Sequence, residues 1–128
     1  MRHDIVADMF CSIKNAEFIG SKTCITPVSK LIKSLLLMMQ KREYIGEFEY
    51  VESSGGGHFR ISLIGKINDC GAIKPRFSVA SGEFIKWEKR FLPAQSLGLL
   101  AVSTSQGVMS HAEAKEKGIG GKLIGYVY

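Results

Sequence analysis

The C-terminal segment V-S-T-S-Q-G-V-M-S-H-A-E-A-K-E-K-G-I-G-G-K-L-I-G-Y-V-Y, from Val102 to Tyr128, carries the strongest structural signals in this chain. The hydrophobic run 97–102 leads into it and is typical of a buried strand. This strand delivers three consecutive hydroxyl side chains, at 103–105, to a turn at Gln106-Gly107. A short charged segment follows, and an apolar run from Lys122 to Tyr128 closes the chain. The pattern predicts two strands connected through a turn and a short helix.

The rest of the second half is predicted to alternate short strands and helices. A strand near Ala72-Ile73 is interrupted by Pro75 and continues through 77–79. Ser81 is expected to cap a helix whose aromatic side chains share one core-facing side, and Pro93 to end it. A capping box begins the charged helix, and a glycine ends it. The residues that define these two helices are Phe84, Trp87, Phe91, Ser110, Glu113 and Gly118.

The first half begins with two predicted helices separated by a short strand. Residues 4–19 are expected to form a helix that Asp4 caps and Gly20 ends. A strand at 22–25 follows. Thr26-Pro27 is expected to open the second helix, because threonine suits the cap and proline the first turn. The expected apolar face of the first helix consists of Ile5, Met9, Ile13 and Ala16, with Val6 and Phe10 alongside. That of the second consists of Leu31, Leu35 and Met38 or Met39.

Polar and apolar residues alternate in 47–52, which predicts a half-buried strand. Its partner is expected at 59–64, so the two form a hairpin. Glycines and Asn68-Asp69 then mark a lobe boundary within Gly65 to Gly71. We therefore expect an α+β fold of two small lobes. The first, 1–64, has helix, strand, helix and hairpin in order, and the second, 65–128, is mainly strands with short helices.

Composition limits the class of protein. The chain has 128 residues, of which 45% are hydrophobic, so its core is limited in size. A formal net charge of +5 favours a nucleic-acid partner or an anionic surface, although surplus surface lysine would give the same value. Three cysteines without C-x-x-C spacing fit a reducing compartment. The start of the chain has no long apolar run, and Leu35 to Met39 is too short to span a bilayer, so we expect a cytoplasmic protein without signal peptide or membrane segment.

Neither a catalytic site nor a metal site is predicted. His3, His58 and His111 are widely spaced, and the sequence shows no carboxylate or thiol partner beside them. His111 follows a helix cap and is expected to be solvated. The segment G-I-G-G-K at 118–122 differs from a Walker loop, because Leu123 follows the lysine and a strand follows the glycines. We therefore expect no cofactor and no enzymatic activity.

Hydroxyls, bare glycine backbone and lysines are the groups that contact a sugar-phosphate chain, but each also has a structural interpretation. The hydroxyls at 103–105 can satisfy turn amides, or can reach base edges and ribose. Ser103 is expected to brace this loop and Ser105 to point outward. Gly120-Gly121-Lys122 can be a tight turn or a phosphate contact. Lys30 and Lys33, with Ser29, can be a solvated helix face or a phosphate site at a helix N-terminus.

Several motifs together resemble the small-subunit ribosomal protein eight family. They are S-T-S-Q-G-V-M at 103–109 and G-G-K-L-I-G-Y at 120–126, with D-I-V-A-D at 4–8, N-A-E at 15–17 and S-K at 29–30. The middle of the chain, Y-I-G-E-F at 44–48 and G-K-I-N-D-C-G-A-I-K-P-R-F at 65–77, looks like the archaeal and eukaryotic branch. The resemblance covers essentially the whole chain.

This resemblance implies a structural component of the small ribosomal subunit. It would be a primary binder of an irregular helix in the central domain of the ribosomal RNA, beside neighbouring ribosomal proteins. The hydroxyl loop would enter a distorted minor groove, and the N-terminal lobe would contact the RNA backbone. The implied RNA-binding residues are Ser103, Thr104, Ser105, Gln106, Gly107, Gly120, Gly121, Lys122, Ser29, Lys30, Lys33, Lys14 and Asn15.

Three alternatives remain. A member of the same family can also repress translation by binding its operon messenger, which mimics the ribosomal site. A phosphate-binding enzyme would need an ionisable group beside the glycine turn, and none is visible. A protein-only interaction module would tolerate the loss of Lys30 and Lys122.

Overall fold

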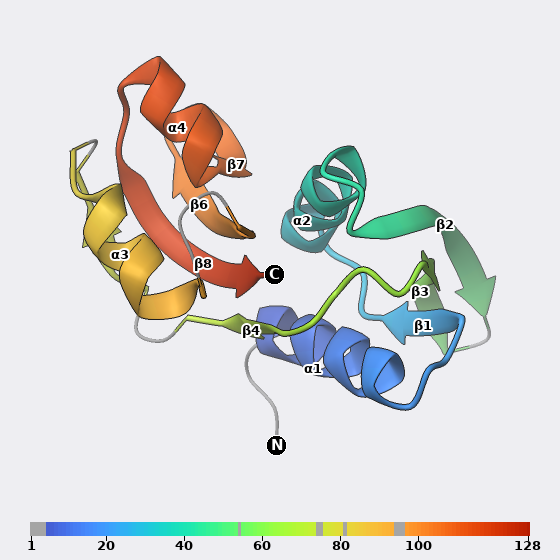
Figure 1. Cartoon of the computed structure of the whole chain (residues 1–128). Helices are drawn as coiled ribbons and strands as arrows, with labels where there is room; N and C mark the ends of the chain where they lie inside the picture. The colour runs from blue at the N-terminus through green and yellow to red at the C-terminus, as the bar shows by residue number, and fades with distance from the viewer. Residues whose placement is uncertain (1–4, 54, 74–75, 81, 94–96) are drawn as a thin grey trace. The chain divides into compact units, whose positions relative to one another are not determined.

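The structure is a computed structural model that describes residues 5–53, 55–73, 76–80, 82–93 and 97–128. The chain divides into two compact units, Met1–Cys70 and Gly71–Tyr128. Each unit combines helices with an antiparallel sheet (Figure 1), which confirms the predicted α+β class.

The first unit contains two helices and a three-stranded sheet of order β1-β3-β2. Its elements are α1 (Ile5–Phe18), β1 (Thr23–Thr26), α2 (Lys30–Lys41), β2 (Ile45–Ser53) and β3 (Gly56–Leu63). The predicted hairpin is confirmed and is longer than expected at the start of both strands. Strand β3 lies in the centre, where its Ile61 is opposite Cys24 of β1 and Phe48 of β2.

Helix α1 buries one face, but this face differs slightly from the predicted stripe. Val6, Met9, Phe10 and Ile13 are buried, at the spacing expected for one side of a helix. Ile5 is 41% exposed, so its assignment to the core was wrong. Gly20 adopts a left-handed φ of 74° just after the helix, as its predicted role requires. The predicted cap, Asp4, lies outside the described residues.

Helix α2 begins later than predicted. Thr26 is the last residue of β1, where it pairs with Phe59, and the cap is Ser29. The amide of Ile32 donates to the Ser29 hydroxyl at 3.1 Å. The prediction that Thr26-Pro27 opens this helix was therefore wrong. Thr26 pairs within the sheet, and the hydroxyl of Ser29, three residues later, caps the helix instead. The buried face of α2 consists of Ile32, Leu35, Leu36, Met38 and Met39, whereas the predicted Leu31 is only half-buried.

The second unit is built on a sheet in which β8 is central. The strand order is β4-β8-β6-β7, and β5 also pairs with β8. The elements are β4 (Cys70–Ala72), β5 (Ser78–Val79), α3 (Phe84–Phe91), β6 (Leu99–Thr104), β7 (Gly107–Ser110), α4 (His111–Lys117) and β8 (Gly121–Val127). Strand β7 was not predicted. It forms because Val108 and Met109 pair with Ser103 and Val102 of β6 directly after the turn.

The core of the second unit lies between α3, α4 and one face of this sheet. Phe84 and Trp87 are buried, and Phe91 packs against them, as their spacing predicted. They meet Leu100 and Val102 of β6. The predicted cap, Ser81, lies outside the described residues, and Glu83 occupies the cap position of α3 without a side-chain hydrogen bond there.

Helix α4 begins and ends where the sequence predicted. The Ser110 hydroxyl accepts a hydrogen bond from the Glu113 amide at 3.3 Å, which satisfies one free amide of the first turn. Gly118 follows the helix with a left-handed φ of 66°, which glycine adopts without strain. The helix therefore ends just before the glycines that enter β8.

Candidate nucleic-acid interface

The hydroxyl run lies at the tip of the β6–β7 hairpin. Ser103 and Thr104 end β6, Ser105 and Gln106 form the turn, and Gly107 begins β7. Ser103, Ser105 and Gln106 are exposed. Gly107 has a φ of 109°, a conformation that residues with a Cβ rarely adopt, so the turn itself requires glycine at this position.

The three hydroxyls differ in what they contact. Thr104 Oγ1 donates to the carbonyl of Gly107 at 2.7 Å and accepts from the amide of Gln106 at 3.1 Å. Thr104 therefore braces the turn, and the expectation that Ser103 does so was wrong. Within the described residues, the hydroxyls of Ser103 and Ser105 form no hydrogen bond, so they are available to a ligand.

Strand pairing places Lys122 beside this loop. Lys122 of β8 is directly opposite Ser103 of β6 on one side and Ser78 of β5 on the other. Directly opposite residues project from the same face, with Cβ atoms about 4.5–5.5 Å apart. All three side chains are exposed. They form a row of hydroxyl, ammonium and hydroxyl groups across three strands, which we call the Ser78–Lys122–Ser103 row.

Ser78 was missed by the sequence analysis. It lies in a two-residue strand with no local motif, and only its register with Lys122 brings it to the row. The motifs at 103–107 and 120–122, by contrast, were recognised separately, and the structure now shows that they are neighbours through β6 and β8.

Close backbone packing around positions 120 and 121 leaves no room for a Cβ atom, so both positions require glycine. A Cβ on Gly120 would collide with the carbonyl oxygen of Val79, and one on Gly121 with that of Ser103. The two glycines therefore allow β8 to pass closely between β5 and β6. This supports the structural interpretation of the glycine pair, whereas a contact of its backbone with RNA remains a prediction.

The second predicted patch lies at the N-terminus of α2. Lys30 is the first residue of this helix and Lys33 lies one turn further, and both are exposed. The Ser29 hydroxyl accepts from the Ile32 amide, so it has a structural role as the cap. It can still donate its proton to a ligand, because a hydroxyl has one donor and two acceptor positions.

Lys14 and Asn15 are exposed on the last turns of α1. The ammonium group of Lys14 lies 3.0 Å from Asp69 Oδ1, so part of its charge is already compensated. Together with the α2 patch, these residues belong to the first unit, whereas the hairpin tip and the Ser78–Lys122–Ser103 row belong to the second.

His111 is a correction to the sequence analysis. It is only 6% exposed, although a solvated position was expected. Its Nδ1 accepts from the Leu100 amide at 3.0 Å, and its Nε2 lies 3.4 Å from Glu88 Oε1. Glu88, which is buried in α3, also contacts the Lys115 ammonium. Both ring nitrogens of His111 thus join α4 to β6 and α3. This partner was invisible in the sequence because Glu88 lies 23 residues away in another helix.

The two buried cysteines, Cys24 and Cys70, are poorly suited to reaction or metal binding. Burial raises the pKa of Cys24 to about 11. Burial, with the nearby charge of Asp69, raises the pKa of Cys70 to about 12. Both thiols are therefore protonated at neutral pH and are poor nucleophiles and ligands. Within the ranges that the structure describes, no three histidine, cysteine or acidic side chains gather as a metal site.

Among the described residues, no helix has both the length and the apolar character needed to cross a membrane.

The chain matches the family described as ribosomal protein S8 over residues 4–128, which is nearly its whole length. This family consists of structural, non-enzymatic proteins of the small ribosomal subunit that bind ribosomal RNA and act in translation. Because this match covers nearly the whole chain, the chain belongs to the ribosomal protein S8 family.

Proposed function

We propose that this protein is a primary binder of an irregular helix in the central domain of small-subunit ribosomal RNA, and that it stabilises the folded shape of that RNA during subunit assembly. The observation that carries the proposal is the Ser78–Lys122–Ser103 row beside the exposed Ser105. It combines one phosphate-binding cation with three short hydroxyls, on a rigid sheet rather than on a free loop.

The chemistry of this surface favours RNA over DNA. The deep groove of an A-form helix is closed to side chains, whereas its shallow groove displays ribose 2′-hydroxyls. Serine hydroxyls both donate and accept, so Ser103 and Ser105 can pair with 2′-hydroxyls and base edges. Lys122 would bind a phosphate of the adjacent strand. The hairpin tip is narrow, because Gly107 has no side chain and Gln106 adds only one. This tip would enter a locally widened minor groove.

The α2 patch would give a second, sequence-independent contact. Lys30 and Lys33 stand on the first turns of α2, where the helix dipole also favours an anion, and Ser29 can donate its hydroxyl proton to a phosphate oxygen. Lys14 and Asn15 would contribute less, because Asp69 already holds the Lys14 ammonium. Backbone groups of Gly120 and Gly121 remain part of the proposed site beside Lys122.

An electrophoretic mobility shift assay with a central-domain RNA fragment tests this proposal. The control is a fully paired RNA duplex of the same length and charge. We expect clear preference for the irregular fragment, since specificity comes from groove shape and sugar contacts rather than from total charge. Equal affinity for the two RNAs would refute specific recognition. Operon messenger RNA belongs in the same assay as a competitor, because a repressor would use the same surface.

A further inference from the structure

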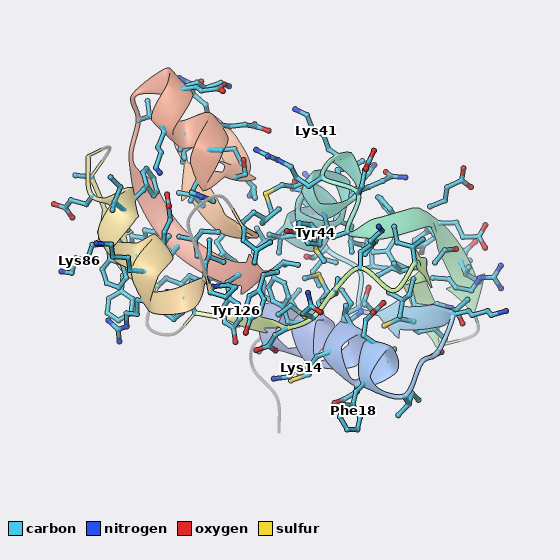
Figure 2. All side chains as sticks on the ribbon, viewed as in Figure 1. Lys14, Phe18, Lys41, Tyr44, Lys86 and Tyr126 are labelled. Atoms are coloured by element: carbon cyan, nitrogen blue, oxygen red, sulfur yellow. The ribbon has the colours of Figure 1, made fainter. Side chains whose placement is uncertain are left out.

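The outward face of α3 carries a cluster of three cations that the proposed function does not use. Lys86, Lys89 and Arg90 are all exposed, and their spacing of three and four residues places them on one side of the helix. Figure 2 shows Lys86 extending outward from α3. We call these three residues the α3 cation face.

Aromatic rings contact two residues of the α3 cation face, Lys86 and Arg90. The guanidinium carbon of Arg90 lies 5.1 Å from the ring centre of Phe77, 5.4 Å from that of Trp87 and 5.5 Å from that of Phe91. The Lys86 ammonium lies 5.3 Å from the centre of the Trp87 ring. Trp87 itself stacks on Phe77 and Phe91, with centres 4.6 Å and 6.3 Å away.

These contacts restrict the side chains without neutralising them. A cation above an aromatic ring keeps its full charge, and a planar guanidinium stacked on rings still presents its donors at the edge. Side chains that are ordered before binding lose less conformational entropy when they bind. A stacked arginine is therefore better prepared to bind an anion than a lysine that moves freely in solvent.

The carboxylate of α3 is directed away from this face. Glu88 is buried and contacts Lys115 and His111 on the inner side. Within the described ranges, Lys86, Lys89 and Arg90 form no ion pair, in contrast to Lys14 with Asp69 or Arg60 with Glu49. The outward side of α3 is thus a patch of positive charge without an ion pair among the described residues, in which rings restrain Lys86 and Arg90.

We propose that the α3 cation face is a further RNA-binding surface, which contacts the phosphates of a segment outside the groove that the hairpin tip enters. This inference rests on the proposed RNA-binding function. Phosphates fit the face because an RNA backbone offers an unbroken row of anions, and because the guanidinium fork pairs with two phosphate oxygens. An acidic protein surface would fit this face less readily, because its carboxylates would have to lie at positions that match the three cations.

The test compares two triple variants that remove the same charge. One carries Lys86→Gln, Lys89→Gln and Arg90→Gln, and the control carries Lys22→Gln, Lys66→Gln and Lys117→Gln, which are exposed lysines outside the proposed site. Affinity for the central-domain fragment is measured by mobility shift between 0.1 and 1 M salt as approximate end points. A thermal melt of each variant shows that it is folded.

We expect the α3 variant to lose about two units of the log–log salt slope, since each phosphate contact contributes about 0.7–0.9. Two units over the decade below 1 M correspond to about a 100-fold weaker binding at about 0.1 M salt. The control should change by less than about one unit. The single variant Arg90→Lys keeps the charge but loses the bidentate fork, and should bind several-fold more weakly.

Three results separate the possibilities. If the unaltered protein does not bind the fragment, the proposed function itself fails. If it binds and the two triple variants weaken equally, the effect is general charge and the α3 proposal is wrong. If the α3 variant binds RNA normally but fails to enter small subunits, the face serves an acidic protein partner, which also overturns the assignment to RNA.

Discussion

Three adjacent hydroxyls of this chain perform three different tasks. Thr104 forms two hydrogen bonds within the turn, Ser103 lies directly opposite Lys122 on the neighbouring strand, and Ser105 is exposed at the tip. The structural interpretation of this run is therefore correct for Thr104, whereas an RNA contact of Ser103 and Ser105 stays a proposal. The sequence alone could not show which hydroxyl has which role, because strand register decides which side chain turns inward.

This distribution predicts opposite effects for two single substitutions. Ser105→Ala should weaken RNA binding by about 1–3 kcal/mol, because a buried partner in the complex loses its hydrogen bond. Its melting temperature should hardly change, since exposed substitutions usually alter stability by less than about 0.5 kcal/mol. Thr104→Ala should instead lower stability by about 1 kcal/mol, because two turn hydrogen bonds are lost.

Thermal melting and mobility shift of both variants provide the measurement. A Ser105→Ala protein that melts much earlier, yet binds RNA normally once folded, would make Ser105 a bracing residue and contradict the proposal. Ser103→Ala serves as a control for stability, because it removes another exposed hydroxyl without altering the turn hydrogen bonds of Thr104.

Thiol chemistry gives a second prediction for single residues. Burial raises the pKa of Cys24 to about 11 and that of Cys70 to about 12, whereas Cys11 is exposed. Iodoacetamide near pH 8 should thus modify Cys11 alone, and all three thiols in denaturant. Because the folded pKa values lie above the reference value of 9.0, protonated thiols favour the folded state below that pH. This contribution should be lost progressively as the pH rises through about 11.

Mass spectrometry of the alkylated protein counts the modified thiols, and a pH series of thermal melts follows the stability. Rapid labelling of Cys70 in the folded protein would show that its site opens readily. As a control, Cys11→Ser should remove all labelling under native conditions.

Individual elements were predictable where their signals are local. The helix ends at Gly20 and Gly118 follow from glycine in a left-handed conformation, and the Ser110 cap follows from its spacing to Glu113. Failures occurred where distant pairing decides. Threonine is a favourable helix cap by its local sequence, but Thr26 pairs with Phe59 of β3 and therefore belongs to strand β1. The Ser78 position and the His111–Glu88 contact depend on partners remote in sequence, so no local pattern could reveal them. Strand β7 is different, because it pairs with β6 across a two-residue turn and is a local hairpin that the sequence analysis missed.

The corrected start of α2 leads to a testable contrast. Ser29→Ala should destabilise the protein by about 1 kcal/mol, because the Ile32 amide loses its cap. Thr26→Val should not destabilise it comparably, because the buried Thr26 hydroxyl has no hydrogen-bond partner among the described residues. Chemical denaturation of the two variants measures both values. A larger loss from Thr26→Val would restore the original cap assignment.

At the scale of the whole molecule, both units carry exposed positive charge, so we expect both to contribute to RNA binding. The net charge of +5 arises from 17 basic and 12 acidic residues. Some cations are compensated internally, such as Lys14 by Asp69 and Arg60 by Glu49. Exposed Lys30 in the first unit and Lys122 in the second form no such pair within the described ranges, so each is a candidate phosphate contact in a different unit.

Combined replacement of these two lysines should reveal whether both units bind the same RNA. RNA affinity should fall linearly with salt on a log–log scale, and Lys30→Gln with Lys122→Gln should lower the slope by about one to two units. Lys66→Gln with Lys117→Gln removes equal charge and should leave the slope nearly unchanged. If each single variant lowers the slope by about half of the combined effect, the two units contact phosphates independently. If the double variant keeps the full slope, neither lysine touches phosphate, and binding must rest on the hydroxyl row and on cations elsewhere, which the α3 variant would then identify.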